Sequence, residues 1–401
     1  MEIGELVRQH RLARKMTQAD LAGPEYSKTF ISRIESGNLI PSLRALEVIA
    51  RRLGVPLATF VGDAWEASRR ANRLERQAQH AREQRRWNEW RDLTSEALDI
   101  ARSYAMHDLV GKLLRELGDG FYEQERWDDA IDAYLSAFAK INPEDANSLA
   151  AVHRKLGAGY FMQEEYLLAR RHYHMALEFV SQQSDDFIRL QTNLATAYMC
   201  QNLYDQAASC YRVAIKHASD LGYAQLKLDA EFGLGALEMR RKHYSDAIPW
   251  LKDALAIAES SDATSLVKSG IRVNMAICAY YCAQDTTAIT ILNDAVSRWI
   301  AEDQWLHVGE AAEALASIYL EQAAWESAIQ LGQEVVPLLI AHHIRYAAAR
   351  LLEVSGRCFL EKQSLEDARA MLSQSYGMYV ATNRYDAAKR VDQLLKMVST
   401  G

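Results

Sequence analysis

Residues 27–33, with the sequence SKTFISR, gather hydroxyl and cationic side chains near the N-terminus. On a helix, the apolar residues Ile31 and Ile34 would face a core, as would Leu21 from the preceding segment. The side chains left on the outer face are Lys28, Thr29, Ser32 and Arg33. Hydroxyls and cations at a helix N-terminus can donate to phosphate oxygens and to acceptors on base edges. The segment therefore predicts contact with nucleic acid.

Five short helices are expected before residue 63 to position these side chains. Thr17, Ser27 and Ser42 are predicted N-caps, because their hydroxyls precede apolar-periodic segments, and Gly37 and Gly54 are predicted stops. Pro56 is expected to open the fifth helix. Helices two and three are separated only by the tight turn GPEY, which makes the third helix cross the second steeply, with its N-terminus outward. Such a helix fits a DNA major groove.

The segments TQADLA, SKTFISRIESG and PSLRALEVIARRLGV resemble the Xre/lambda-repressor-like helix-turn-helix family over about sixty residues. The resemblance implies a phosphate contact from Gln18. It also implies base-edge contacts from the third helix and backbone contacts from the loop after it. The implied DNA-binding residues are Gln18, Ser27, Lys28, Thr29, Ser32, Arg33, Asn38 and Ser42. The turn is one residue shorter than the commonest family spacing, because Gly23-Pro24 comes early. The alternative is a five-helix domain that serves only as a protein contact.

Charge is distributed unevenly along the 401 residues, whose net charge is −7. Residues 1–62 carry +3 and residues 63–91 carry +3, so the remainder carries −13. An N-terminal part that approaches a polyanion and an acidic body that does not are the expected arrangement. The longest apolar run, VVPLLIA at 335–341, is too short to span a membrane. The chain is accordingly expected to be cytoplasmic, with no membrane partner.

The five cysteines are odd in number and lie within apolar helical patterns without a CxxC pair. We expect buried thiols, no metal site and no cofactor. Phosphate-loop, GxSxG and HExxH motifs are missing from the sequence, and His172 and His174 cannot face one ligand from one helix. The chain is therefore predicted not to be an enzyme.

A repeat begins near residue 114. In each unit a small residue is followed twelve positions later by an alanine, and the units recur every 38 to 41 residues. The small residues are Gly118, Gly157, Ala195, Gly235, Ala276, Ala316 and Gly356; the alanines are Ala130, Ala169, Ala207, Ala247, Ala288, Ala328 and Ala368. A fixed internal offset with variable spacing predicts helical hairpins joined by variable links.

A large side chain stands three residues before most of these alanines, as Trp127 and Tyr166 illustrate. This pattern resembles the tetratricopeptide repeat, and it implies a right-handed superhelix with an inner groove. HEAT-like repeats are the second choice. The surplus over the usual repeat length is expected at 181–186 and 258–265, in helix ends and links.

The expected fold is all-α, in four parts. Residues 1–62 form the helix-turn-helix domain. Residues 63–104 form a long linker helix, with Trp65 to Trp90 on it, and a degenerate first repeat. Residues 105–383 hold about seven repeats, and 384–401 form a capping helix. Arginines of the linker are expected to pair with Glu75 and Glu83 on a solvated face.

The position that faces the groove in tetratricopeptide superhelices lies two residues before the small one. It holds polar residues in four units, Glu116, Lys155, Asn193 and Asn274, and it holds Gly233, Ala314 and Val354 in the other three. An amide offers a donor and an acceptor, which suits the backbone of an extended peptide, and rings and methionines would take its apolar side chains. The ordinary alternative is a solvated polar wall without a ligand.

A helix-turn-helix head joined to such repeats resembles the cytosolic pheromone-peptide receptors of Gram-positive bacteria. The resemblance implies that Asn193 and Asn274 clamp a short peptide and that cations hold its carboxylates. The implied effector-binding residues are Arg115, Tyr122, Arg154, Lys155, Arg189, Asn193, Met239, Asn274 and Tyr280. The expected function is transcription regulation by a homodimer that binds operator DNA, paired through the linker or the convex repeat surface. Docking of a protein partner, or an adaptor role without DNA, are the alternatives.

Overall fold

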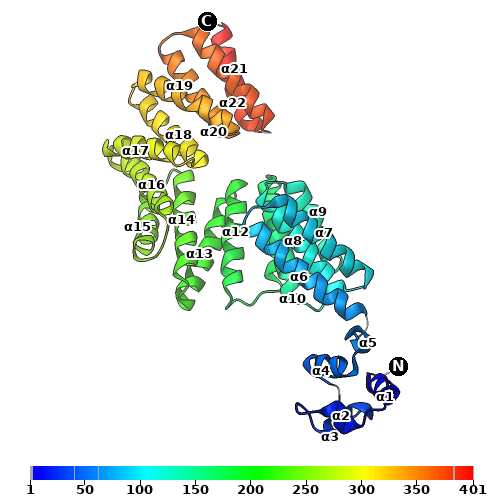
Figure 1. The fold of residues 1–401 in the computed structure, drawn as a ribbon. Helices are drawn as coiled ribbons and strands as arrows, with labels where there is room; N and C mark the ends of the chain where they lie inside the picture. The colour runs from blue at the N-terminus through cyan, green and yellow to red at the C-terminus, as the bar shows by residue number, and fades with distance from the viewer. Residues whose placement is uncertain (1–2, 40, 62, 383, 401) are drawn as a thin grey trace. The chain divides into compact units, whose positions relative to one another are not determined.

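The computed structural model describes residues 3–39, 41–61, 63–382 and 384–400, and its regular secondary structure is helical throughout (Figure 1). The all-α fold class is therefore confirmed. The chain divides into two compact units, Met1–Val180 and Ser181–Gly401. The first holds the N-terminal head and three helical hairpins, and the second holds five hairpins and a final helix.

The head contains five helices, as the sequence predicts. Thr17 begins the second with a capping box, in which its hydroxyl accepts from the Asp20 amide while the Asp20 carboxylate accepts from the Thr17 amide. Ser27 and Ser42 cap the next two helices with their hydroxyls. Gly54 ends the fourth in the left-handed region, at φ 58°. The helices are α1 Ile3–Ala13, α2 Gln18–Ala22, α3 Lys28–Glu35, α4 Leu43–Leu53 and α5 Ala58–Val61.

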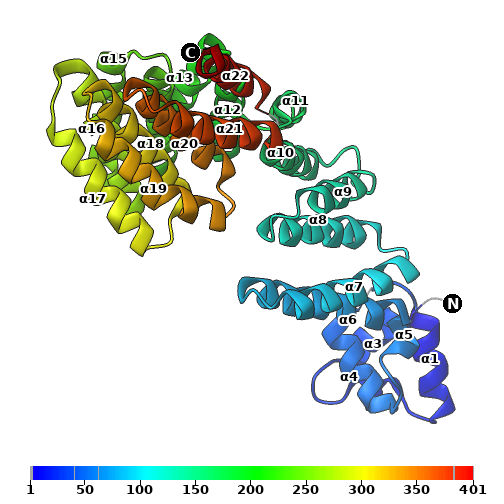
Figure 2. The ribbon, with the colours of Figure 1, turned by 90° about the horizontal axis from the view of Figure 1, so that it is seen from above.

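Helices α6 to α21 pair into antiparallel hairpins that follow one another along the chain (Figures 1 and 2). In the first unit they are α6 Asp63–Glu83 with α7 Trp87–Ser103, α8 His107–Glu123 with α9 Trp127–Phe138, and α10 Ala146–Met162 with α11 Tyr166–Leu177. In the second unit they are α12 Asp185–Cys200 with α13 Tyr204–Leu221, α14 Ala224–Arg240 with α15 Tyr244–Ser260, α16 Ser265–Ala283 with α17 Thr287–Ala301, α18 Trp305–Glu321 with α19 Trp325–Ala341, and α20 Arg345–Glu361 with α21 Leu365–Ala381, followed by α22 Tyr385–Thr400.

One turn geometry recurs between the two helices of a hairpin. A non-glycine residue there takes a positive φ, at Arg85, Glu125, Glu164, Asn202, Lys242, Gln284, Ala323 and Gln363. In most hairpins this residue lies seven positions after the small residue of the repeat, and Arg85 stands in the same relation to Ala78. The expected long helix across 65–90 is therefore wrong, because Arg85 turns the chain back.

The close approach within a hairpin joins the small residue to a larger side chain sixteen positions later. A Cβ at Gly118 would lie 2.4 Å from the Tyr134 ring, and one at Gly157 would lie 2.5 Å from the Tyr173 ring. The alanines twelve positions after the small residues are all fully buried, from Ala130 to Ala368. The twelve-residue offset thus marks the core of the hairpin, while the ring four residues farther on is what excludes a side chain from the glycine.

The forty-residue period arises from helix length. Helices α18 to α21 each have 17 residues, and the turns 322–324, 342–344 and 362–364 have about three residues each, as is common for helix–helix connections. Links do lengthen near 181–186 and 258–265, but the hairpins with the shortest links keep the same period. The surplus is therefore built into the helices.

Arginines on α6 form ion pairs with residues of other helices. Arg82 lies 3.9 Å from Asp119 and 3.6 Å from Glu123, and the buried Glu75 accepts from Lys112 at 2.7 Å. The expected pairing of α6 arginines with Glu75 on a solvated face is wrong for this reason. These cross-helix ion pairs join the first hairpin to the second.

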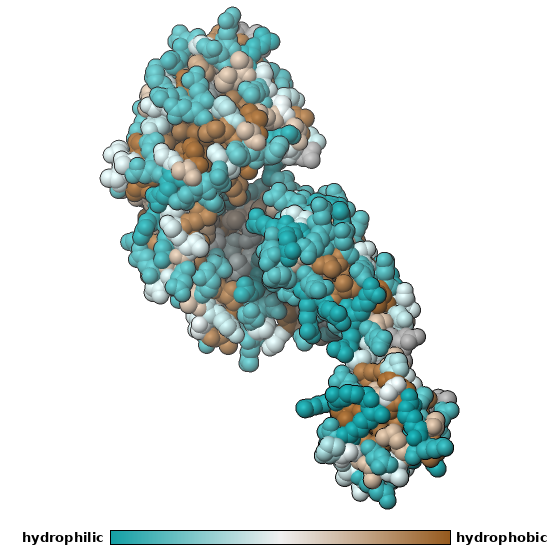
Figure 3. All heavy atoms as spheres, viewed as in Figure 1, coloured by the Kyte–Doolittle hydropathy of each residue, from teal (hydrophilic) through white to brown (hydrophobic). Residues whose placement is uncertain are grey.

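The surface is mixed, and Figure 3 shows hydrophilic residues over most of the visible face with hydrophobic residues in smaller patches. No helix in the described ranges combines the length and the apolar composition that a membrane span requires. Cys278 and Cys358 are buried as expected, and Cys200 and Cys210 are half-buried. Cys282 is exposed, so the expectation of a buried thiol is wrong there.

Candidate DNA-binding head and effector-binding repeats

Helix α3 presents the polar face that the sequence predicts. Ile31 and Ile34 are buried in the core of the head with Leu21. Around them Ser27, Lys28, Thr29 and Arg33 are exposed, and Ser32 is half-buried. The structure therefore places these five residues together on the outer side and N-terminal end of α3.

Several of these side chains have no partner among the residues that the structure describes. Lys28, Thr29 and Arg33 form no side-chain hydrogen bond or ion pair with any residue in the described ranges. The Ser27 hydroxyl, in contrast, accepts from the Phe30 amide, and the Ser42 hydroxyl accepts from the Ala45 amide. Ser27 and Ser42 thus serve first as caps, and Lys28, Thr29 and Arg33 are the groups left to meet a ligand.

Asn38 follows α3 and is exposed, with its amide donating to the Ser36 hydroxyl at 3.0 Å. The Ser36 hydroxyl in turn donates to the Arg33 carbonyl at 3.2 Å. Asn38 therefore lies at the C-terminal end of α3, near the loop that the resemblance assigns to backbone contacts.

A buried ion pair fixes the direction of α3. Arg11 on α1 and Glu35 at the end of α3 are joined by two hydrogen bonds, from Nε to Oε1 at 2.6 Å and from Nη2 to Oε2 at 2.8 Å. The two side chains are 9 % and 4 % exposed. Burial favours a raised pKa for Glu35, but hydrogen bonds from Arg11 and Gln18 outweigh it, so the pKa of this carboxyl lies below its ordinary value.

Gln18 belongs to this buried network. Its side-chain amide donates to Glu35 Oε2 at 2.9 Å, and the residue is half-buried. The phosphate contact implied for Gln18 therefore requires this amide to leave Glu35 or to act through its free oxygen. Sequence reasoning missed Arg11 and Glu35, although Arg11 shares the buried face of α1 with Gly4 and Val7 at helical spacing.

Arg52 explains the short turn between α2 and α3. Its guanidinium donates to the carbonyls of Leu21 and Ala22, and it forms an ion pair with Glu25. A Cβ at Gly23, where φ is +50°, would collide with this guanidinium. Arg52 thereby satisfies the last carbonyls of α2 and holds the turn that aims α3.

In the first unit, the predicted groove cations differ in burial and in the residues around them. Lys155 on α10 forms a 2.9 Å ion pair with Asp119 on α8, and Asp119 also accepts from the Tyr134 hydroxyl at 2.7 Å. Arg115 and Arg154 are half-buried, and Arg115 lines a small polar hollow with Lys112 and Lys140. Tyr122 is half-buried and packs edge-on against Trp127. Lys155 is therefore already used to join two hairpins.

Glu116 occupies the predicted groove-facing position beside Glu75. Burial, with hydrogen bonding to Glu75, raises the pKa of Glu116 to about 7, while Lys112 contributes to a lowered pKa for Glu75. The two carboxyls thus share one proton below about pH 7.

In the second unit, the two predicted clamp asparagines keep free amides. Asn193 on α12 and Asn274 on α16 are half-buried, and neither side chain hydrogen-bonds to another residue that the structure describes. Met239 is half-buried against the core, and Arg189 is exposed with an ion pair to Asp185 at 3.4 Å. The two amides are consequently able to bond an outside group.

The expected role of Tyr280 is wrong. Its side chain is only 1 % exposed and packs in the core with Ala288 and Leu292. The periodicity of α16 places Tyr280 on the face that meets α17, so it contributes to the hairpin and is closed to an effector.

An apolar hollow of about 590 Å³, which the sequence did not indicate, lies among α19, α20 and α21. Its walls include Val336, Pro337, Phe359 and Met371. Most hairpins carry Tyr or Leu sixteen positions after the small residue, but the hairpin α18–α19 carries Gly332 there. Gly332 lets the Ser355 side chain approach, since a Cβ there would lie 2.4 Å from its hydroxyl. The missing bulky residue is the sequence signal for this hollow.

Comparisons with known proteins agree with this two-part architecture. A family model described as a helix-turn-helix domain matches residues 2–60. Among curated protein sequences, none matches this chain.

Solved structures share the repeat fold at low identity. Aspartyl phosphate phosphatase F from Bacillus subtilis is 17 % identical, with a TM-score of 0.56 over 94 % of this chain and 93 % of that one. A Rap protein complexed with Competence and Sporulation Factor is 14 % identical, with a TM-score of 0.54 over 84 % and 98 %. A tetratricopeptide repeat protein from Parabacteroides merdae ATCC 43184 is 17 % identical, with a TM-score of 0.52 over 72 % and 98 %. The chain thus joins a helix-turn-helix domain to repeats with the fold of tetratricopeptide and Rap proteins.

Proposed function

We propose that the protein is a sequence-specific, DNA-binding transcription regulator. The observation that carries the proposal is the outer face of α3, where Lys28, Thr29 and Arg33 are exposed and form no bond within the described residues. Cations and hydroxyls in this position match the acceptors of phosphates and of major-groove base edges. A gel-shift titration with DNA from the region upstream of the gene tests it, and equal affinity for unrelated DNA of the same length would contradict sequence-specific binding.

The regulator acts as a homodimer in this proposal, within the cytoplasm. One head reads only a half-site, so two heads are needed for tight operator binding, and the half-sites would lie about one helical turn apart or a multiple of it. Analytical ultracentrifugation with and without operator DNA tests the dimer. A single protomer on the DNA at saturation would exclude it.

The repeats bind an effector, for which a short signalling peptide is our first choice. The free amides of Asn193 and Asn274 support this choice, because one amide can both donate to and accept from a peptide backbone. The Rap protein of similar fold was solved in complex with the Competence and Sporulation Factor, which gives a precedent for effector binding by a protein of this fold. Calorimetric titration with a library of short peptides is the direct test.

Effector binding would change operator binding by favouring one of two arrangements of the repeats. To move the protein from mostly one state to mostly the other, the effector must prefer that state by about 5 kcal/mol. By reciprocity, operator DNA must then change the affinity for the effector by the same factor. Measuring effector affinity with and without DNA tests this coupling.

Docking of a protein partner is the second candidate for the repeats. The apolar hollow among α19, α20 and α21 favours it, because Val336, Phe359 and Met371 offer the kind of surface that an apolar anchor residue fills. Substituting Met371 with Glu should abolish partner binding and leave peptide binding through Asn193 unchanged. Neither proposal assigns a catalytic residue.

A further inference from the structure

The hairpin α14–α15 departs from the other hairpins at the turn that joins its helices. Three residues after the small residue, most hairpins carry a ring, as at Phe121, Tyr160, Tyr198, Tyr319 and Phe359. In α14–α15 the same position holds Glu238, which is only 5 % exposed. Burying a carboxylate costs free energy unless it is paired, so Glu238 in place of a ring requires a group that compensates its negative charge.

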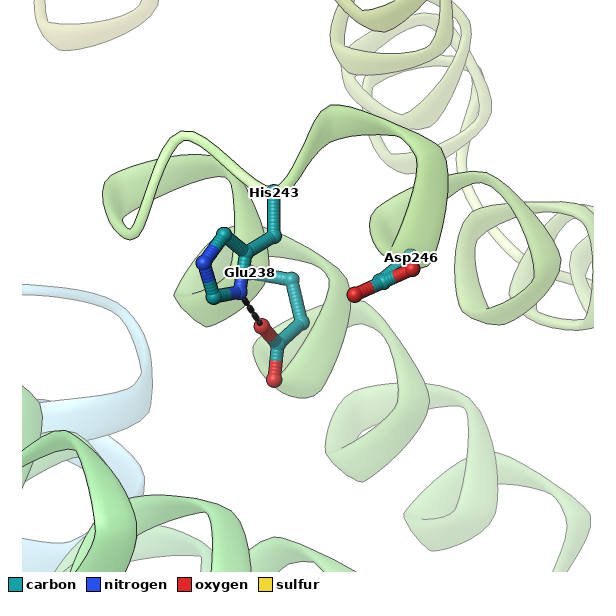
Figure 4. Close-up of side chains that lie close together, drawn as sticks. All are labelled: Glu238, His243 and Asp246. Atoms are coloured by element: carbon teal, nitrogen blue, oxygen red, sulfur yellow. Dashed lines mark hydrogen bonds and ion pairs between the residues drawn. The ribbon is translucent and has the colours of Figure 1, made fainter.

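Two other side chains converge on Glu238 (Figure 4). His243, at the start of α15, places Nδ1 3.2 Å from Glu238 Oε2. Asp246 extends toward them from the first turn of α15. One ligating atom from each of the three residues lies within 4.8 Å of the others.

The hairpin α8–α9 carries a cation at the equivalent place. There Arg126 lies over the Phe121 ring, with its guanidinium carbon 4.5 Å from the ring centroid, and pairs with Asp129 at 2.7 Å. A permanent cation thus sits between the ring position and the acid of the next helix. In α14–α15 the corresponding residues are Glu238, His243 and Asp246, so two carboxylates lie beside an imidazole in place of a guanidinium.

Arg241 compensates for part of this negative charge. Its Nη1 lies 3.5 Å from Glu238 Oε1, but its Nη2 is bonded to Asp205 and its guanidinium lies over the Tyr204 ring. Arg241 is therefore shared with a second carboxylate and faces Oε1. Oε2, which faces His243, is left for another cation.

From this arrangement we propose that Glu238, His243 and Asp246 bind a first-row divalent transition-metal ion, with Zn²⁺ as the ion of choice. Imidazole nitrogen and carboxylate oxygens bind Zn²⁺ at about 2.0 to 2.2 Å, so ligating atoms within 4.8 Å of one another need only small side-chain movements to reach one ion. A nitrogen ligand favours Zn²⁺ over Mg²⁺, which prefers oxygen ligands and keeps its water. The ion would supply the cation that Arg126 supplies in α8–α9, and it would tie α14 to α15.

The test is a Zn²⁺ titration of the full-length protein against a chromophoric competitor, with Mg²⁺ in parallel. We expect a Zn²⁺ site that His243→Asn and Asp246→Asn each weaken by at least about tenfold. Asn is a good helix N-cap, so the first change should preserve the start of α15, and Asp246 is exposed, so the second should not disturb packing. His343→Asn, in an exposed turn at φ 63°, is the matched control and should bind as the unchanged protein does.

Hydrogen exchange provides a second measurement that does not depend on counting ions. Zn²⁺ should slow amide exchange at the adjoining ends of α14 and α15 in the unchanged protein and in His343→Asn, and it should not do so in His243→Asn. Equal Zn²⁺ affinity in all four proteins would overturn the proposal, as would Mg²⁺ binding as tight as Zn²⁺ binding. Because the readouts are ion binding and exchange in one hairpin, they are independent of whether the head binds DNA.

Discussion

The Arg11 guanidinium holds the Glu35 carboxylate by two hydrogen bonds, and this pair joins the first helix of the head to the end of α3. Because both side chains are almost fully buried, the pair determines the direction of α3 more firmly than an exposed ion pair could.

Replacing Glu35 with Gln should lower the free energy of unfolding of the head by about 3 kcal/mol, because the Arg11 charge would stay buried without its partner. Hydrogen exchange of the α1 and α3 amides measures this loss. Glu47→Gln removes an exposed partner of Arg69 and should cost less than about 1 kcal/mol. The lowered pKa of Glu35 fixes the pH dependence. Its contribution is complete above the ordinary carboxyl pKa, and it disappears as the pH falls through the lower folded value.

Substituting Lys28 or Arg33 with Ala should weaken operator binding by about 1 to 3 kcal/mol if the side chain reads a base. A phosphate contact would instead weaken binding to all sequences alike and reduce its salt dependence. Gel-shift titrations at two salt concentrations distinguish the two cases. Lys252→Ala, an exposed lysine on α15, is the charge-matched control. Unchanged DNA binding in both head variants would show that the face that contacts DNA does not lie on α3.

Asn193→Ala and Asn274→Ala should each weaken peptide binding, since each removes a donor and an acceptor that no described residue of the protein uses. A loss of roughly 1 kcal/mol per lost hydrogen bond is expected in calorimetric titrations. Asn88→Ala, exposed on α7, is the control. A peptide that binds both variants with its original affinity would exclude these asparagines as the clamp.

Glu116 makes the stability of the contact between α6 and α8 depend on pH near neutrality. Its folded pKa, about 7, lies above its ordinary value, so the stabilisation is complete below the ordinary value and declines as the pH rises through about 7. The protection factors of amides in α6 and α8, which are corrected for the intrinsic base-catalysed exchange rate, should therefore fall between pH 5 and pH 8. Glu116→Gln should remove most of that fall. An identical pH profile in the variant would show that another group is responsible.

Gly118→Ala should destabilise its hairpin by about 1 to 3 kcal/mol, because the new Cβ would lie 2.4 Å from the Tyr134 ring. Gly270→Ala on α16 meets nothing within 4 Å and should instead stabilise its helix by about 0.5 to 1 kcal/mol. Urea denaturation of the two variants compares these signs. The same sign in both would contradict the packing described for Gly118.

The sequence predicted those features that depend on local spacing. The caps Thr17, Ser27 and Ser42 were found because a hydroxyl precedes a periodic segment, and the buried alanines from Ala130 to Ala368 were found because their offset never changes. The exposed face of α3 followed from where Ile31 and Ile34 must point. Each of these depends on residues within one or two helices.

Features that depend on contacts between distant residues were missed. Arg11 and Glu35 are 24 residues apart, and nothing in either segment names the other as its partner. Lys155 was expected to face an effector, but Asp119 on another hairpin already binds it. Tyr280 was expected to contact an effector because it lies four residues after the small residue, as Tyr122 and Met239 do, but it packs against Ala288 and Leu292. Which partner a side chain binds can be predicted only when its neighbours in space are known.

The recurrence of 17-residue helices with three-residue turns from α18 to α21 has a consequence for how the chain can change in length. Each forty-residue segment begins and ends in the same local geometry, so excising or duplicating one in register should leave both junctions correctly packed. An insertion of another length inside a helix would rotate the rest of that helix about its axis and move its buried residues off the core. Whole modules and links should accordingly tolerate changes in length better than the helices do.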